Sequence, residues 1–271
     1  MKKILFIIDK IELKYFEFNN LVTNFWMIKE FLERGNRVFI TTISNLSLKQ
    51  DVAYTKCFET FTDKNNIFYK DIKIEKEIND FDLVMFRPDP PVDIDYINAT
   101  YIFDFVTKPR VINSPQAIRD FNEKLHSVYF KELMTDNIVT ASLEEIEEFL
   151  AKYKQIVLKP LNRCFGSGVM YLYEGDPNTR TIINTMTNNE TTLVMVQEFI
   201  PAVKQGDKRV LTLGNKVLKY CIKKLPTNDD FKFNTHNDNF ITSAELTDVE
   251  FEHFTKLLAR ICELFFIVIK I

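Results

Sequence analysis

The apolar positions in the first part of the chain follow two different spacings. Residues 4–8 form an unbroken apolar run, which predicts a buried β-strand. Further along the chain, apolar positions lie three or four residues apart, at Leu21, Phe25, Ile28 and Leu32. That spacing predicts one face of a helix, which ends at Gly35. Residues 37–43 predict another strand, and a β-α-β unit of this kind favours a parallel sheet.

A further apolar run, residues 81–86, predicts a strand that ends in charged residues. The sequence Arg87-Pro88-Asp89-Pro90-Pro91 follows it directly. Charged groups in this position lie at the carboxyl edge of a sheet, where α/β proteins tend to bind ligands. Arg87 and Asp89 are therefore candidate substrate-binding residues. An internal ion pair in a proline-stiffened turn is the alternative.

Local signals elsewhere in the chain predict two helix starts and an apolar strand. Ser114 is placed to cap a helix whose first position is Pro115. Ser142 precedes Glu145 by three residues, which is the spacing of a capping box. The apolar positions of that second helix are Ile146, Phe149, Leu150 and Tyr153. Residues 264–271 form an apolar run that predicts a buried strand.

The first candidate for chemistry follows a predicted strand at residues 155–158. Lys159 ends this strand, and the loop after it contains Gly166, Ser167 and Gly168. An ammonium group beside glycines, which let backbone N–H groups approach closely, is typical of a phosphate site. The spacing is not that of a P-loop, and a plain turn is the alternative interpretation.

Three further segments add nucleotide-binding character. Residues 194–200 predict a strand in which Gln197 and Glu198 can present backbone groups to an adenine. Asp207 can accept hydrogen bonds from ribose hydroxyls, and Arg209 can hold phosphate oxygens bidentately, before a strand predicted at residues 210–213. The third segment is Asn122-Glu123-Lys124. Each segment alone fits a solvated turn better than a site, but together and in this order they resemble an ATP-grasp enzyme.

The resemblance extends to a single family. From about residue 80 to about residue 226, the chain resembles bacterial glutathione synthetase in the order and approximate spacing of its blocks. The blocks are Arg87-Pro88-Asp89-Pro90-Pro91, Ile112-Asn113-Ser114-Pro115-Gln116, Arg119-Asp120-Phe121-Asn122-Glu123-Lys124, Leu158-Lys159-Pro160-Leu161, Glu174-Gly175-Asp176-Pro177-Asn178 and Gly206-Asp207-Lys208-Arg209-Val210-Leu211. The resemblance implies an α/β fold of the α+β grasp type. A parallel-sheet pre-ATP-grasp domain would cover residues 1–120, and a two-lobed ATP-grasp domain, its last part missing, would cover residues 121–271.

By this resemblance the protein would be an ATP-dependent C–N ligase that joins γ-glutamylcysteine and glycine through an acyl phosphate. The residues that would bind ATP are Lys124 and Lys159 at the phosphates, Gly166, Ser167 and Gly168 in the loop, Gln197, Glu198 and Phe199 at the adenine, and Asp207 at the ribose. Arg209 and Lys224 would be the catalytic cations, with Lys224 in place of the usual arginine. The cofactors would be ATP and Mg²⁺, with Mn²⁺ as an alternative metal.

Departures from the family pattern concern mainly its metal-binding end. Lys270 stands where the family has an aspartate ligand, and the Glu-x-Asn pair of ligands does not follow, so no residue of this chain is predicted to hold the metal. The loop at residues 227–239 lacks the family's glycines, and Asn19 and Asn20 lie where it has an acidic-hydroxyl cluster. We therefore expect impaired activity. The alternatives are a degenerate, inactive nucleotide-binding homologue and another ATP-grasp carboxylate-amine ligase.

Composition sets limits on partners and location. The 271 residues are 46% hydrophobic with a net charge of −3, which suits one large or two modest domains and gives no basic face for nucleic acid. The cysteines, Cys57, Cys164, Cys221 and Cys262, show no paired spacing. The apolar runs are too short for a signal peptide or a membrane span. These features predict a cytoplasmic protein with free thiols, and the family resemblance is compatible with a homo-oligomer.

Overall fold

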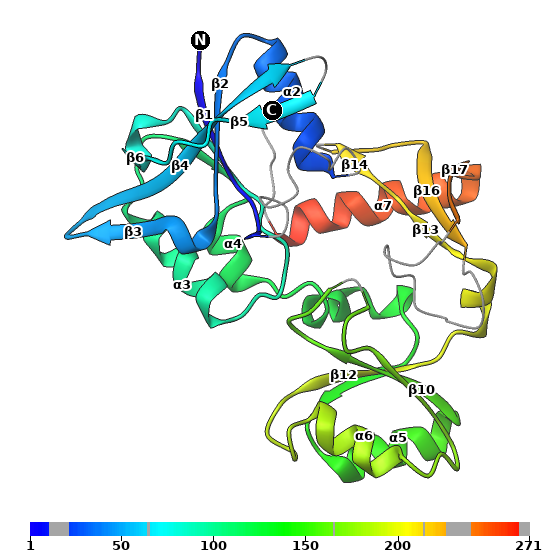
Figure 1. Cartoon of the computed structure of the whole chain (residues 1–271). Coiled ribbons are helices and arrows are strands. Elements are labelled where there is room, and N and C mark those ends of the chain that lie inside the picture. The colour runs from blue at the N-terminus through cyan, green and yellow to red at the C-terminus, as the bar shows by residue number, and fades with distance from the viewer. Residues whose placement is uncertain (11–21, 64–65, 165, 214, 226–239, 266–271) are drawn as a thin grey trace. The chain divides into compact units, whose positions relative to one another are not determined.

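The computed structural model describes residues 1–10, 22–63, 66–164, 166–213, 215–225 and 240–265, and its chain forms two compact units. Unit 1 comprises Met1–Phe130 together with Leu161–Cys164, and unit 2 comprises Lys131–Pro160 and Phe165–Ile271. Figure 1 shows the helices and strands of both units. The domain boundary expected at residue 120 stays a prediction; the chain leaves unit 1 after Phe130 and returns to it for Leu161–Cys164.

Unit 1 contains an eight-stranded sheet whose central strands are parallel. Its order is β3-β4-β2-β1-β7-β8, with β5 and β6 paired to β4. The parallel strands are β1 (Lys3–Ile7), β2 (Arg37–Thr41), β7 (Leu83–Phe86) and β8 (Arg110–Ile112). The antiparallel strands are β3 (Leu46–Lys49), β4 (Val52–Asp63), β5 (Asn66–Tyr69) and β6 (Ile74–Glu77). The β-α-β unit and the parallel sheet predicted from the sequence are confirmed.

Helices cover both faces of the parallel strands. Ile4 and Phe6 belong to one buried cluster with Phe25 of α2 (Thr23–Glu33), whereas Leu5 and Ile7 belong to another with Tyr96 of α3 (Ile94–Ile102). Strands that are buried on both faces are apolar at every position. This explains why residues 4–8 show a continuous apolar run and no alternation.

The helix ends follow the expected local signals. At the end of α2 the Gly35 N–H donates to the Leu32 carbonyl and the Asn36 N–H to the Phe31 carbonyl, and Gly35 has φ +76°, as a Schellman motif requires. Ser114 caps α4 (Pro115–Asp120) by accepting from the Ala117 N–H. Both helices were predicted from these residues. Short 3₁₀ segments occur at Ile43–Asn45, Ile78–Asp80, Phe103–Phe105, Leu125–Leu133 and Pro201–Gln205.

Unit 2 contains a four-stranded antiparallel sheet covered by helices on one face. Its order is β11-β10-β12-β9. The elements are β9 (Asn137–Thr140), α5 (Leu143–Tyr153), β10 (Gln155–Pro160), β11 (Met170–Tyr173), α6 (Thr179–Met186) and β12 (Val194–Glu198). Ser142 caps α5 as expected, and Ile146, Phe149 and Leu150 are buried. Figure 1 shows α5 and α6 lying along the same side of β10 and β12.

The rest of unit 2 forms a second, smaller assembly. A three-stranded antiparallel sheet joins β13 (Asp207–Arg209), β16 (Tyr220–Leu225) and β17 (Phe240–Glu245). A hairpin pairs β14 (Thr212–Leu213) with β15 (Lys216–Val217), and the helix α7 (Asp248–Phe265) follows β17. Cys221, Val217 and Leu246 are buried there.

Two strand predictions were wrong in this region. The strand expected at residues 210–213 is divided: Thr212 and Leu213 form β14, and the preceding strand, β13, is made of the polar residues Asp207–Arg209. Leu264 and Phe265, expected to start a strand, end the helix α7. Residues 266–271, with Lys270, and the loop at 227–239 lie outside the described residues, as do Asn19, Asn20 and Leu21.

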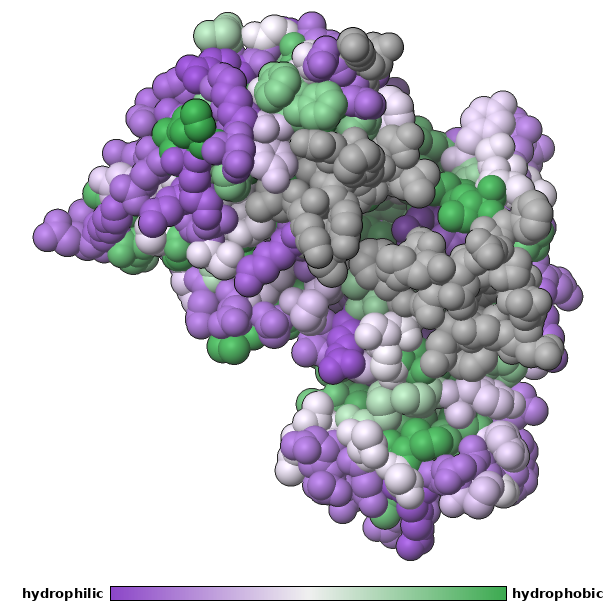
Figure 2. All heavy atoms as spheres, in the orientation of Figure 1, coloured by the Kyte–Doolittle hydropathy of each residue, from purple (hydrophilic) through white to green (hydrophobic). Residues whose placement is uncertain are grey.

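The described surface is mixed in character. On the face shown in Figure 2, hydrophilic residues cover most of it and hydrophobic residues form small separate groups. Within the described ranges, the search for a helix with the length and apolar character of a membrane span finds none.

Candidate functional site

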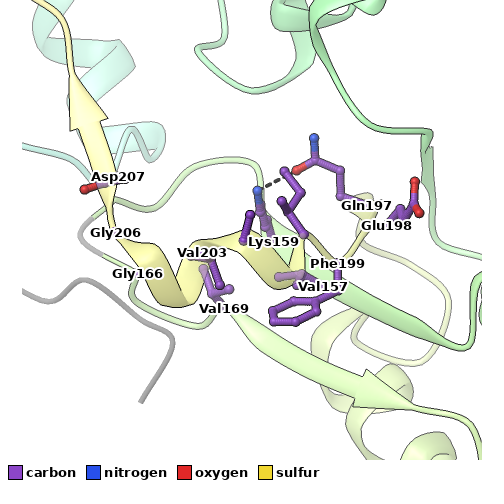
Figure 3. Close-up of a pocket in the computed structure, with 12 residues that line it drawn as sticks. Val157, Lys159, Gly166, Val169, Gln197, Glu198, Phe199, Val203, Gly206 and Asp207 are labelled. Atoms are coloured by element: carbon purple, nitrogen blue, oxygen red, sulfur yellow. Dashed lines mark hydrogen bonds between the residues drawn. The ribbon is translucent and has the colours of Figure 1, made fainter. Parts of the chain in front are cut away.

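A cavity of about 460 Å³ lies in unit 2. It is bordered by β10, by the end of β12, by the 3₁₀ segment Pro201–Gln205 and by the start of β13 (Figure 3). Its lining residues are Val157, Lys159, Gly166, Val169, Gln197, Glu198, Phe199, Ile200, Ala202, Val203, Gly206 and Asp207. Six of the nine predicted ATP-binding residues are thus brought together: Lys159, Gly166, Gln197, Glu198, Phe199 and Asp207.

The alternation of side chains along β10 separates the cavity from the core. Ile156 and Leu158 are fully buried in the cluster that includes Phe149 of α5 and Ile183 of α6. Successive side chains of a strand point to opposite faces, so Val157 and Lys159 face the other side and line the cavity. The sheet therefore uses one face for packing and the other for the site.

Lys159 and Gln197 are in direct contact on the cavity side of the sheet. The Lys159 Nζ donates to the Gln197 Oε1 over 2.5 Å, as Figure 3 shows. Gln197 lies opposite Val157 in the antiparallel pairing of β10 and β12, which puts it diagonally next to Lys159 on the same face. Both side chains are half-buried. The ammonium group predicted from the sequence thus has an amide partner within the same site.

Apolar side chains form much of the cavity wall. Val157, Val169 and Val203 line the cavity together with Phe199 (Figure 3). The Phe199 ring meets Tyr171 edge to face, with 4.8 Å between ring centroids. A flat apolar ligand fits such walls, because small-molecule sites are mostly apolar with a few convergent polar groups.

Six lining residues were not predicted, namely Val157, Val169, Ile200, Ala202, Val203 and Gly206. Val157 could have been found, because it is two positions before Lys159 on a strand and so shares its face. Nothing in the local pattern distinguishes the others from ordinary loop residues.

The backbone at the end of β12 limits how a base could bind. The Glu198 N–H donates to the Asp136 carbonyl over 3.0 Å, and the Phe199 N–H donates to the Gln155 carbonyl over 3.1 Å. The sequence interpretation assigned backbone groups near Gln197 and Glu198 to an adenine. With these two N–H groups already paired, other groups at the end of β12 would have to meet the base edge.

Asp207 follows a glycine that another residue could replace only with strain. Gly206 has φ +99° and ψ 173°, a region that is essentially restricted to glycine. A Cβ atom there would overlap the carbonyl oxygen of Lys224, which lies opposite Asp207 in the pairing of β13 and β16. The close approach of these two strands therefore sets the position of Asp207 at the cavity.

The remaining predicted residues of unit 2 are outside the lining set. Ser167 and Gly168 follow Gly166 in the loop, and Arg209 is exposed at the end of β13. Lys224 is buried, with 7% of its surface exposed, one strand away from Asp207. The Lys208 Nζ donates to the Glu250 carboxylate. This hydrogen bond and one from the Thr247 N–H lower the pKa of Glu250 to about 2.

Lys124 belongs to unit 1, where it holds the segment that follows β10. Its Nζ contacts the Glu123 carboxylate at 2.6 Å and also the backbone carbonyl of Arg163. Asn122 Nδ2 donates to the Leu161 carbonyl over 2.8 Å. The block Asn122-Glu123-Lys124 therefore anchors residues 161–163 in this structure.

Arg87 and Asp89 lie in a polar cluster at the carboxyl edge of the parallel sheet, as predicted. The Arg87 Nε donates to the Oδ1 of Asn24 at the start of α2 over 2.5 Å. Desolvation raises the pKa of Asp89, and the Asp9 carboxylate, which follows β1, raises it further. Asp9 and Asn24 were missed, although a polar residue directly after the apolar run at residues 4–8 is the same signal that identified Arg87 after β7.

A metal site is not shown by the described side chains. Among them, no group of three or more His, Cys, Asp or Glu residues is arranged to hold an ion. The predicted loss of the family's ligands rests on Lys270, outside the described residues, and stays a prediction. Cys57, Cys164 and Cys221 are free thiols, as expected.

Comparison with solved structures identifies the fold. D-cycloserine synthetase DcsG is similar with a TM-score of 0.68 and 13% identity, over 98% of this chain and 82% of that one. D-alanyl-alanine synthetase A from Vibrio cholerae O1 biovar eltor has a TM-score of 0.61 and 12% identity, over 97% and 80%. The ATP-grasp ligase PsnB, solved with a phosphomimetic precursor variant, Mg and ADP, has a TM-score of 0.55 and 15% identity, over 96% and 81%. The chain has the ATP-grasp fold, as predicted.

Sequence comparison identifies the family. The family model of the prokaryotic glutathione synthetase N-terminal domain matches residues 2–119, and that of the ATP-grasp domain matches residues 123–269. Glutathione synthetase of Vibrio parahaemolyticus is 34% identical over 218 residues, which are 78% of this chain and 68% of that protein. Glutathione synthetase of Neisseria meningitidis serogroup B is 33% identical over 86% of this chain and 75% of that protein. The chain belongs to the prokaryotic glutathione synthetase family, a family of ATP-dependent C–N ligases, which confirms the resemblance.

Proposed function

We propose that this protein binds ATP in the cavity of unit 2 and ligates γ-glutamylcysteine to glycine, releasing ADP and phosphate. The observation that supports it most is the convergence of Lys159, Phe199 and Asp207 on one cavity, in a chain that belongs to the glutathione synthetase family. An ammonium group, an aromatic wall and a carboxylate suit the phosphates, the base and the ribose of one nucleotide. We also infer a cytoplasmic location and domain limits at residues 1–120 and 121–271.

In this proposal the adenine lies against Phe199 and the valines, between Gln197 and Glu198 at one end and Asp207 at the other. Lys159 and the loop of Gly166, Ser167 and Gly168 hold the phosphates. Lys124 is assigned to the phosphates as well. To reach them it would exchange its present contacts with Glu123 and the Arg163 carbonyl.

The reaction needs cations more than a protein nucleophile. An oxygen of the cysteinyl carboxylate attacks the γ-phosphorus, the bond to the β–γ bridging oxygen breaks, and ADP leaves. The glycine amine then attacks the acyl phosphate, loses a proton, and phosphate leaves as the amide forms. Arg209 and Lys224 are assigned to the negative charge that moves between these oxygens.

Mg²⁺ or Mn²⁺ bound with ATP would neutralise charge on the phosphate oxygens. Because the described residues show no group that would hold the ion, no step is assigned to it. For the substrate we propose the cluster of Arg87 and Asp89 with Asn24 and Asp9. Its mixed charges suit a ligand that carries both a carboxylate and an ammonium group, as γ-glutamylcysteine does.

The test is ADP release by the purified chain with ATP, Mg²⁺ and γ-glutamylcysteine, with and without glycine. We expect release that depends on both substrates and that falls strongly in Lys159→Met. Lys152→Met, at an exposed lysine on α5, is the matched control. ATP binding without any release would favour the inactive homologue. Release that depends on another amine but not on glycine would favour a different ATP-grasp ligase.

A further inference from the structure

The loop that joins β10 to β11 is held at its start by unit 1. Its first residues, Leu161–Cys164, belong to unit 1, whereas Gly166 lines the cavity in unit 2. The Val92 N–H donates to the Asn162 carbonyl over 3.0 Å, so backbone pairing contributes to this anchorage. The loop that carries the proposed phosphate-binding glycines is therefore fixed at one end before any ligand binds.

Asn122 supplies a side-chain contact to the same segment, and its amide can face the loop in only one orientation. The Oδ1 accepts from the backbone N–H groups of Lys124 and Leu125, both over 2.9 Å, where the 3₁₀ segment Leu125–Leu133 begins. The Nδ2 donates to the Leu161 carbonyl over 2.8 Å. Because two N–H donors fix the position of the oxygen, the NH₂ group must be the end that meets Leu161.

The two roles of this side chain can be separated by substitution. Asparagine, aspartate and serine all accept hydrogen bonds well at the start of a helical segment. An aspartate would keep those bonds but turn its second oxygen toward the Leu161 carbonyl, and two acceptors without a proton between them repel each other. The contact with the loop therefore requires the amide, whereas the cap does not.

We propose that Asn122 is a positioning residue that limits the conformations of the loop carrying Gly166, Ser167 and Gly168, and so lowers the entropic cost of binding ATP phosphates. This inference rests on the proposed nucleotide site. Gly166 and Gly168 have φ of +68° and +71°, and glycine loses more conformational freedom than any other residue when it is ordered. A loop restrained in advance loses less of that freedom on binding.

The decisive variant is Asn122→Asp, which keeps the cap and removes the contact with the loop. Calorimetric titration of the full chain with ATP, ADP and adenosine separates the phosphates from the base. We expect ATP and ADP to bind about fivefold more weakly, the typical effect of one lost hydrogen bond, and adenosine to stay within about twofold of wild type. In the ligation assay the KM for ATP should rise while kcat changes little, because the loop holds ground state and transition state alike.

Asn79→Asp is the matched control for the added charge. The Asn79 Oδ1 also accepts from two backbone N–H groups of unit 1, those of Thr107 and Lys108, over 3.0 and 3.1 Å. Among the described residues its Nδ2 has no acceptor, so this variant should bind all three ligands as wild type does. Asn122→Ser removes the contact without adding charge and should weaken ATP binding about threefold. A loss in Asn122→Asp with none in Asn122→Ser would assign the effect to charge and overturn the inference.

Hydrogen exchange in the ligand-free protein tests the anchorage without any nucleotide. The Val92 amide is the reporter, because its acceptor is the Asn162 carbonyl of the anchored segment. It should exchange about fivefold faster in Asn122→Asp than in wild type. The Ile97 amide, which donates to the Asp93 carbonyl at the start of α3, should not change.

The two measurements keep the inference and the nucleotide site apart. Unchanged exchange at Val92 in Asn122→Asp would show that Asn122 does not hold the loop. Faster exchange with wild-type ATP affinity would show that holding the loop does not serve the phosphates. Either result overturns the inference and leaves the nucleotide site in place. If the wild-type protein bound neither ATP nor ADP, the nucleotide site itself would fail, and the role of Asn122 in phosphate binding with it.

Discussion

At the scale of single residues, the absence of a Cβ atom at Gly206 matters both for the backbone geometry and for the site, because Asp207 of the cavity is the next residue. Gly206→Ala places a methyl group on the Lys224 carbonyl oxygen and forces a non-glycine residue to φ +99°. We expect a loss of about 3 kcal/mol in the free energy of unfolding, measured by urea denaturation. ATP affinity should fall as well, because Asp207 moves with its neighbour.

Gly35→Ala is the matched control for that prediction. Gly35 also has positive φ, +76°, but a Cβ atom there would meet no atom within 4 Å. The expected loss is therefore the conformational term alone, about 1 kcal/mol, with unchanged ATP affinity. Equal losses of stability in the two variants would contradict the overlap with Lys224.

At the scale of elements, Glu59 of β4 connects neighbouring strands through charge. Its carboxylate accepts from Arg37 of β2 at 2.6 Å and from Lys70, which follows β5, at 2.9 Å. The Arg37 guanidinium, with a smaller contribution from Lys70, lowers the pKa of Glu59. Only 14% of the Glu59 side chain is exposed, but Arg37 and Lys70 are more exposed. Solvent therefore screens the two ion pairs and reduces their contribution to stability. Glu59→Gln should lower the unfolding free energy by about 1 kcal/mol at pH 7.

The pH dependence of that difference follows from the sign of the shift. A carboxyl whose pKa is lower in the folded than in the unfolded state stabilises the fold at pH values above the unfolded pKa of about 4.3. This stabilisation is lost as the pH falls through the folded pKa. The gap between wild type and Glu59→Gln should therefore close in acid. Glu75→Gln, which removes an exposed ion pair with Lys49, should show no measurable gap at either pH. A gap that widens in acid would refute the assignment.

Elements with strong local signals were predictable from the sequence, and those set by tertiary pairing were not. Gly35 and Ser142 gave the ends of α2 and α5 because caps act within one turn. The pattern of β13 gives no such signal: Asp207, Lys208 and Arg209 form a strand only because β16 is beside them. Leu264 and Phe265 were misassigned because a short apolar run fits a buried strand and the last turn of an amphipathic helix equally well.

In the site, too, single residues with local signals could be predicted, whereas contacts that depend on strand pairing could not. Lys159 and Asp207 could be identified because charged residues at the ends of strands are visible in sequence. The contact between Lys159 and Gln197 depends on the register of β10 and β12, and a shift by one residue would have placed Glu198 there instead. Asp9 and Asn24 meet Arg87 and Asp89 only through the order of the parallel strands, which spacing along the chain does not give.

At the scale of the whole molecule, the proposal predicts where ATP slows amide hydrogen exchange. A ligand at about 100 times its Kd adds about 2.7 kcal/mol to the stability of the part that binds it. The buried amides of Ile156, Leu158 and Val196 in unit 2 should therefore exchange about 100-fold more slowly with ATP. The core of unit 1, at Leu5 and Val38, should change less if the two units open separately.

The same experiment tests the role assigned to Lys124, because that residue lies in unit 1 whereas the cavity lies in unit 2. If its ammonium holds ATP phosphates, ATP should also protect the amides around residues 122–127, and Lys124→Ala should remove that protection. Lys159→Met should reduce the protection throughout unit 2, because it weakens binding itself. If ATP slows exchange in unit 2 of the wild type but not at residues 122–127, Lys124 does not bind the nucleotide. Its contacts with Glu123 and Arg163 would then serve to anchor the loop after β10.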